Sequence, residues 1–390
     1  MIIRNIALIA SSATLYGAER ALLDSVRKFS HEYHFVVVVP ETGDLVDQLN
    51  RAGATAHLIR FPILDRKYFH PLRILAYLAS GFVGWFRLIQ FLRKARPDIV
   101  HSNNVLILPG ALAARVLKIP HVWHVREIIE GHHIHPLLWK LWRWIILTFS
   151  DRVICISKAV SAQFGENRKV VIVHDGADTA RFRPAKSRTA SSREDNSITF
   201  GIVGRLEHRR KGQDLFIEAA NNALKKRPDL EFIIVGHERE GMEKEEQKLH
   251  DLVASYGLEK KIHFRGFVAP GQMPSAMNEL DVLVLCSKQP EGLAIVLLEA
   301  MAAGKAVVSF AEGGPLDILE DGINGLLVPP RDIEKLADAM VKLASDGKLR
   351  ARLGTAGRKT VDERFRSEMT ASRIESVYKT VLSERRLQVS

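Results

Sequence analysis

The chain has 390 residues, of which 46% are hydrophobic and 26% charged, with a net charge of +11. The length allows two ordinary domains with large cores, and the composition excludes an intrinsically disordered chain. No apolar run is long enough to cross a bilayer. Most of the positive charge falls in residues 1–180, which favours an anionic surface or a phosphorylated substrate. We rank nucleic acid last among the partners because no motif of nucleic-acid-binding proteins is present.

Short apolar runs alternate with helical patterns along the whole chain, which predicts parallel sheets of βαβ units. Strands are expected at 5–10, 35–39, 99–101, 121–125, 152–156 and 170–173, and again at 198–203, 231–235, 261–264, 281–286, 306–309 and 326–328. We predict an α/β protein with two doubly wound domains (1–180 and 198–365), a polar linker (181–197) and a final helix within 366–390. Ligands are expected in a cleft between the domains, at the carboxyl ends of the strands.

The first predicted strand is followed by a polar loop, residues 11–20, that contains Gly17. A glycine that opens a helix allows backbone N–H groups to approach an anion. Most such turns only reverse the chain, so this glycine by itself is weak evidence for a site.

Two apolar helical stretches in the first half carry basic residues. Residues 72–92 have arginine or lysine near both ends, and residues 137–149 carry Trp139, Trp142 and Trp144 interleaved with Lys140 and Arg143. This composition is typical of an interfacial contact with a membrane. The alternative is that both helices cover a sheet and bury their apolar faces.

Two further strands of the first half end in polar residues. His101 ends one of them, and His124 is followed by Arg126 and Glu127 at the end of the next. Arginine cannot be a general base near neutral pH, but it can steady a phosphate or a developing oxyanion. The nearby His132, His133 and His135 lack the partners of a metal site and read as a polar loop.

In the second half, cations follow a strand. Gly204 and Arg205 come directly after residues 198–203, and Lys211 precedes Gly212. Such cations suit a diphosphate leaving group, and no D-x-D triplet is present to hold a divalent metal. The alternative is a solvated run of charge at residues 209–211.

The segment 290–304 reads as a polar loop, a Glu-Gly pair and a helix, directly after a buried strand. Gly292 and the helix N-terminus would form a seat for an anion. Glu299 lies within an otherwise apolar helix predicted at 293–303, where an unpaired carboxylate is costly, so we expect it to face a polar crevice and bind hydroxyl groups. The alternative is that Glu291 and Glu299 only contribute solubility.

This segment resembles the E-x7-E motif of the retaining glycosyltransferases of family GT4, which share the two-domain GT-B fold. The resemblance implies two Rossmann-like domains and a C-terminal helix that crosses back to the first domain. The resemblance implies that Glu291 and the amides of Gly292, Leu293 and Ala294 hold sugar and phosphates, and that Glu299 holds the ribose. It implies further donor contacts at Gly17, Gly204, Arg205, Lys211, Gly236, Phe267 and Val268. The implied catalytic residues are Glu291, Arg205, Lys211, Arg126 and Glu127, and the implied acceptor side comprises Tyr16, His101, His124 and Arg126.

The chain departs from the family pattern at several positions. Asp317 replaces a common glutamate, and the usual spacing after Arg205 would place Arg210 where we expect Lys211. Tyr16 replaces the first glycine of a Gly-Gly-x-Glu loop, Arg126 stands where many relatives have histidine, and Asp175 replaces an asparagine.

The resemblance implies a retaining, metal-independent transferase without a cofactor. It would move a hexosyl or N-acetylhexosaminyl group from a nucleoside diphosphate, UDP being favoured over GDP, to a glycan or polyprenyl-linked hydroxyl. The context would be polysaccharide or lipopolysaccharide synthesis at the inner face of the cytoplasmic membrane. The alternatives are a non-catalytic partner subunit that binds nucleotide-sugar and an epimerase of similar fold.

Overall fold

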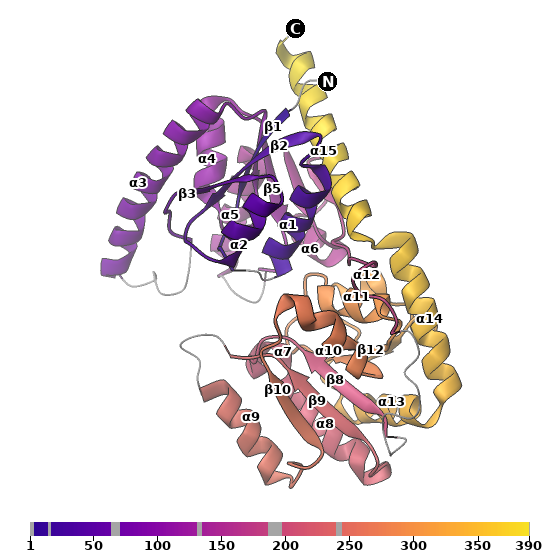
Figure 1. The fold of residues 1–390 in the computed structure, drawn as a ribbon. Coiled ribbons are helices and arrows are strands. Elements are labelled where there is room, and N and C mark those ends of the chain that lie inside the picture. The colour runs from indigo at the N-terminus through magenta and orange to yellow at the C-terminus, as the bar shows by residue number, and fades with distance from the viewer. Residues whose placement is uncertain are drawn as a thin grey trace. The chain divides into compact units, whose positions relative to one another are not determined.

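The computed structural model describes residues 4–14, 17–63, 71–130, 135–185, 197–238 and 244–389. The chain divides into two compact units (Figure 1). Unit 1 comprises Met1–Asp175 and Ser367–Ser390, and unit 2 comprises Gly176–Arg366. The first boundary between the units, at Asp175 and Gly176, comes before the predicted linker at 181–197. Most of that linker lies outside the described residues.

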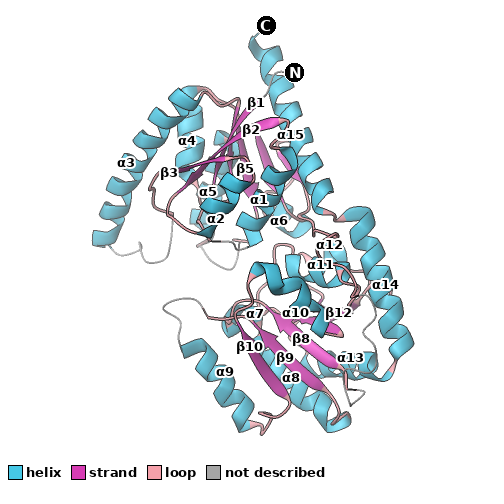
Figure 2. Ribbon diagram, viewed as in Figure 1, coloured by secondary structure: helices cyan, strands magenta, loops and turns pink. Residues whose placement is uncertain are grey.

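Unit 1 contains a parallel seven-stranded sheet in the order β3-β2-β1-β4-β5-β6-β7. Its strands are β1 (Arg4–Ile9), β2 (Tyr33–Val39), β3 (Thr55–Leu58), β4 (Ile99–Ser102), β5 (His121–Val125), β6 (Arg152–Cys155) and β7 (Val170–Ile172). Its helices are α1 (Gly17–Phe29), α2 (Asp44–Arg51), α3 (Pro71–Ala95), α4 (Leu108–Leu117), α5 (Pro136–Phe149), α6 (Lys158–Ala162) and α15 (Ser367–Val389). Figure 2 shows helices flanking the strands in each unit.

Both faces of the unit 1 sheet are buried, which explains the nearly continuous apolar strands. In β1, Ile6 and Leu8 pack with α1, α2 and α15, whereas Ala7 and Ile9 pack with α3 and α4. The last helix, α15, therefore completes the core of unit 1, as the predicted crossing helix requires.

Unit 2 contains a parallel six-stranded sheet in the order β10-β9-β8-β11-β12-β13. Its strands are β8 (Thr199–Val203), β9 (Glu231–Val235), β10 (Ile262–Gly266), β11 (Val282–Leu285), β12 (Ala306–Phe310) and β13 (Leu326–Val328). Its helices are α7 (His208–Lys211), α8 (Gln213–Lys226), α9 (Lys244–Ser255), the short 3-10 turn Pro270–Gln272, α10 (Met273–Glu279), α11 (Ile295–Ala302), α12 (Pro315–Ile318), α13 (Ile333–Ser345) and α14 (Gly347–Arg364). The strand order reverses between β8 and β11, and ligands of such sheets bind at this point.

Every predicted strand is present, with ends shifted by at most two residues. The sequence analysis missed β3, since its four residues are half-buried or exposed and lack an apolar pattern. Among the described residues, no helix is long and apolar enough to span a membrane.

Candidate functional site

The loops that follow the strands of unit 2 pack tightly against one another. The Gly204 amide donates to the carbonyl of Val235 at 2.9 Å, and the Gly236 amide donates to the carbonyl of Gly266 at 3.0 Å. Gly236 has a φ of +147°, and a Cβ there would lie 1.8 Å from the Gly204 oxygen. Only glycine fits at Gly236 because of this close approach. The predicted donor loops after β8, β9 and β10 therefore lie against one another at one edge of the sheet.

Two predicted catalytic residues, Lys211 and Glu291, contact each other directly. Lys211 Nζ donates to Glu291 Oε1 at 2.7 Å, and Ser287 Oγ donates to the same oxygen at 2.7 Å. Lys211 ends α7, where Gly212 continues with a φ of +74° and passes so close to Cys286 that a Cβ would lie 2.0 Å from its carbonyl oxygen. The segments that follow β8 and β11 thus meet where the strand order reverses, and this contact places Lys211 next to Glu291.

The charge of Glu291 is stabilised by its neighbours. Burial by itself would raise the pKa of this carboxyl, but the positive charges of Lys211 and Arg210, with the hydrogen bonds from Lys211 and Ser287, lower it to about 2. The side chains of Lys211 and Glu291 are only 21% and 11% exposed. The site thus holds a carboxylate that stays ionised, paired with a largely buried lysine.

The loop that carries Glu291 is fixed by a second glycine pair. The Gly314 amide donates to the Glu291 carbonyl at 2.8 Å, and a Cβ on Gly314 would lie 2.4 Å from the Gly292 oxygen. Ala294 has a φ of +70°, a strained conformation for a residue with a side chain, and such strain gathers at functional sites. The helix α11 begins at Ile295, two residues after the predicted start, so Gly292 and Ala294 belong to the loop.

The other predicted donor residues of unit 2 lie at the same strand ends. Phe267, after β10, is 64% exposed, and its ring meets the ring of His237 edge to face at 4.8 Å. Val268 is buried and packs with Val235. The backbone oxygen of Arg205 accepts a hydrogen bond from Gln213 Nε2 at 2.7 Å.

Glu299 and Leu293 are both buried. Glu299 is 4% exposed on α11 and Leu293 is 1% exposed. A small hollow beside Glu291 is lined by Ser287, Gln289, Pro290, Glu312 and other residues, but not by Glu299. The structure therefore gathers Lys211, Ser287 and Glu291, and buries Glu299 on α11.

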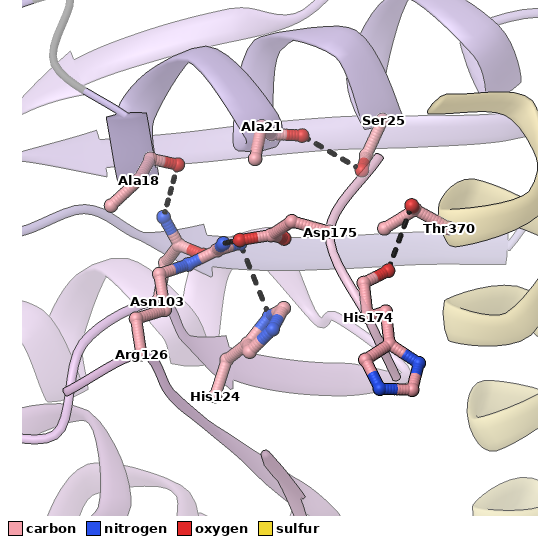
Figure 3. A network of polar contacts seen from close by, with 9 residues as sticks. All are labelled: Ala18, Ala21, Ser25, Asn103, His124, Arg126, His174, Asp175 and Thr370. Carbon is pink, nitrogen blue, oxygen red and sulfur yellow. Dashed lines mark hydrogen bonds and ion pairs between the residues drawn. The ribbon is translucent and has the colours of Figure 1, made fainter. Parts of the chain in front are cut away.

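Unit 1 has its own polar cluster at the carboxyl ends of β4, β5 and β7 (Figure 3). Arg126 Nη1 donates to Asp175 Oδ2 at 2.5 Å, and Arg126 Nε and Nη2 donate to Asn103 Oδ1 at 3.3 and 3.2 Å. Arg126 Nη2 also lies 3.4 Å from His124 Nδ1. The predicted phosphate-binding cation is therefore buried and engaged within unit 1.

The predicted acceptor histidines are buried and neutral. Burial, with a smaller contribution from Arg126, lowers the pKa of His101 to about 3 and that of His124 well below its usual value. His101 Nδ1 lies 2.6 Å from the hydroxyl of Tyr378 on α15. Neither ring can act as a general acid near neutral pH, since neither binds a second proton there.

Of the remaining predicted residues, Gly17 is exposed at the first position of α1, and Tyr16 lies outside the described residues. Glu127 is exposed, and its backbone oxygen accepts a hydrogen bond from Gln163 Nε2 at 2.9 Å. His135 caps α5, and the histidines at 132 and 133 lie outside the described residues.

Several residues of these clusters were missed by the sequence analysis. Glu19 is buried beside Ser11, whose hydroxyl donates to it at 2.9 Å, and burial raises the pKa of Glu19 despite that bond. The position of Glu19, two residues after Gly17 at the start of a predicted helix, could have indicated it from the sequence. Ser287 and Gln163 gave no such indication, because their roles depend on contacts between separate loops.

Comparison with known proteins identifies relatives of both units. Residues 16–181 match the family model described as Glycosyltransferase Family 4, and residues 185–360 match that of the Glycosyl transferases group 1. The D-inositol 3-phosphate glycosyltransferase of Kribbella flavida is 31% identical over 73% of this chain and 71% of its own length. The phosphatidyl-myo-inositol mannosyltransferase of Mycobacterium tuberculosis is 32% identical over 54% of each chain.

Solved structures share the fold. HepE of Anabaena, crystallised with UDP and glucose, superposes with a TM-score of 0.83 at 23% identity, over 96% of this chain and 99% of its own. The sucrose-phosphate synthase of Thermosynechococcus elongatus superposes with a TM-score of 0.77 at 19% identity, over 98% of this chain and all of its own.

Proposed function

Because the chain belongs to glycosyltransferase family 4 and has the GT-B fold, we propose that this glycosyltransferase takes its sugar from a nucleoside diphosphate and retains the anomeric configuration. The sugar is a hexose or an N-acetylhexosamine, carried on UDP. The acceptor is a hydroxyl of a glycan or lipid-linked molecule, in the synthesis of cell-surface polysaccharide or lipopolysaccharide.

The observation that carries this proposal is the ion pair between Lys211 and Glu291. Negative charge develops on the diphosphate when the bond to the sugar breaks, and a lysine in a largely buried site offsets it strongly. We propose that Lys211 moves from Glu291 to the diphosphate, with Arg205 beside it. Glu291, ionised at any physiological pH, then accepts hydrogen bonds from the sugar hydroxyls.

Two features support a reaction without a metal ion and without a covalent intermediate on the protein. The cations Arg205 and Lys211 follow β8, the strand at the reversal of the sheet order, where they take the part of a divalent ion. Glu291 is tied to Lys211 and Ser287, so we assign it to binding and not to nucleophilic attack. The departing phosphate itself helps to accept the proton of the acceptor hydroxyl, and the protein contributes positioning.

The choice of nucleotide is tested by calorimetry with UDP, GDP, ADP and CMP. We expect UDP to bind selectively and Glu299→Ala to abolish that binding, because the ribose loses its partner. The control is Glu334→Ala, which changes an exposed glutamate on α13 of the same unit. Selective binding of GDP would correct the base, and no binding of any nucleotide would refute the donor site. Retention is read separately, from the anomeric coupling constant of the product by NMR.

We further propose that α3 and α5 contact an anionic membrane at the cytoplasmic face. Phe82, Val83 and Phe86 on α3 are 48–64% exposed, and Leu137, Leu138, Leu141 and Trp144 on α5 are 46–67% exposed. Trp139, in contrast, is buried in the core and Trp142 donates to the Val105 carbonyl, so only part of α5 is available. Exposed aromatic and aliphatic residues next to Lys140 and Arg143 suit a lipid headgroup boundary.

Co-sedimentation with vesicles tests this surface. We expect binding to vesicles that contain phosphatidylglycerol and little binding to pure phosphatidylcholine. The triple substitution Leu137→Ser, Leu141→Ser and Trp144→Ser should weaken binding about tenfold or more, since about 25 cal/mol is lost for each Å² of apolar area withheld from the lipid. Ile323→Ser, which changes an exposed residue of unit 2, is the control. Undiminished binding of the triple variant would refute the surface.

A further inference from the structure

The two departures from the family pattern at Arg126 and Asp175 prove to be one feature. They lie 49 positions apart in the sequence, yet they form an ion pair of 2.5 Å. Their side chains are only 6% and 2% exposed. A buried charge needs compensation, so an arginine in this place requires an acid beside it, and the acid requires the arginine.

The remaining hydrogen bonds of Arg126 also stay within unit 1. Its guanidinium donates to Asn103 through two nitrogens and lies against His124. Among the described residues, the second carboxylate oxygen of Asp175 accepts no hydrogen bond, so Arg126 is the main compensation for that charge. A phosphate could take Arg126 only by leaving the buried carboxylate of Asp175 uncompensated.

The contacts of this pair extend to two predicted site segments. Asn103, held by Arg126, donates through Nδ2 to the carbonyl of Ala18 in the first turn of α1, directly after Gly17 (Figure 3). The side chain of Arg126 is buried, whereas that of Glu127, the next residue, is exposed. The pair thus ties the end of β5 to the first turn of α1 and to the segment after β7.

We infer that Arg126 and Asp175 act together as positioning residues that set the first turn of α1, which begins at Gly17, and Glu127, and that Arg126 does not bind the reacting phosphate. This inference rests on the proposed function for its kinetic consequence. The contact geometry on which it depends lies wholly within unit 1.

The test is a double-mutant cycle in the full chain, with Arg126→Gln, Asp175→Asn and the double variant. Each single variant leaves one buried charge uncompensated, so its Tm should fall by about 5–10 °C. The double variant is neutral, and its Tm should return to within about 3 °C of the wild type. The exposed pair Lys226–Asp338, changed to Gln and Asn, is the control and should show no coupling.

The kinetic readout is the release of UDP from UDP-glucose by hydrolysis, in which water accepts the sugar, with UDP affinity measured alongside by calorimetry. We expect the single variants to lose about tenfold or more in kcat, with the Kd for UDP within twofold, and the double variant to recover most of the loss. The exchange rate of the backbone amides in the first turn of α1 should rise in the single variants and return to the wild-type rate in the double variant. This result does not depend on which nucleotide-sugar the enzyme uses.

A cation that binds the reacting phosphate would give a different pattern. The folded double variant would then remain about tenfold or more slower than the wild type; that result would overturn the inference. Because this comparison needs only the double variant and the wild type, it holds even when a single variant fails to fold. Absence of UDP binding by the wild type would instead refute the proposed function, while the Tm and exchange data would still decide the positioning role.

Discussion

Replacing Glu291 by glutamine removes the negative charge at the centre of the donor site while keeping the shape of the side chain. The pKa of Glu291 is lowered from 4.5 to about 2 in the folded chain. At about 1.4 kcal/mol for each pKa unit, ionisation of this carboxyl stabilises the fold by about 3 kcal/mol. Since the folded pKa is the lower one, this stability is present above about pH 4.5 and is lost as the pH falls towards 2.

We therefore expect Glu291→Gln to lower the free energy of unfolding by about 3 kcal/mol at pH 7, and by progressively less below about pH 4.5. The measurement is urea unfolding between pH 3 and pH 7.5, followed by far-UV circular dichroism. The five tryptophans all lie in unit 1, so their fluorescence follows that unit and should be unchanged by the substitution. Glu334→Gln, at an exposed position of unit 2, is the control.

A difference between Glu291→Gln and the wild type that stays constant from pH 7.5 to pH 3 would refute this reasoning, because it would show that ionisation of Glu291 does not contribute to stability. A difference near zero at pH 7 would do the same, since the pair with Lys211 would then only balance the burial of the two charges.

Two further substitutions test how the loops and the crossing helix are held. Gly212→Ala should destabilise unit 2 by several kcal/mol in urea unfolding, because its Cβ would lie 2.0 Å from the Cys286 oxygen; Gly257→Ala, with a similar φ but open space, should cost only about 1 kcal/mol. Equal losses would show that the φ angle matters and the close approach does not. Tyr378→Phe removes the hydroxyl next to His101 and should lower the stability of unit 1 by about 1–3 kcal/mol, read by tryptophan fluorescence. No loss would mean that the hydroxyl of Tyr378 does not help to hold α15 on unit 1.

Local patterns in the sequence determined the class of fold. Apolar runs of three to six residues between helical segments predicted every strand but β3, since buried parallel strands need apolar residues on both faces. The same patterns place polar residues in the segments that follow strands, so Arg126, Lys211 and Glu291 could be predicted as site residues from the sequence.

Only the tertiary structure decided which of these residues meet. Lys211 and Glu291 are 80 positions apart and Arg126 and Asp175 are 49 apart. Their contacts follow from the order of strands in each sheet, which places β8 beside β11 and β5 near β7. Strand order is set by the packing of whole helices and sheets, and no local pattern records it. The types of residue therefore indicated which side chains could bind an anion or a sugar. The order of strands decided that Lys211 pairs with Glu291 and that Arg126 is buried against Asp175.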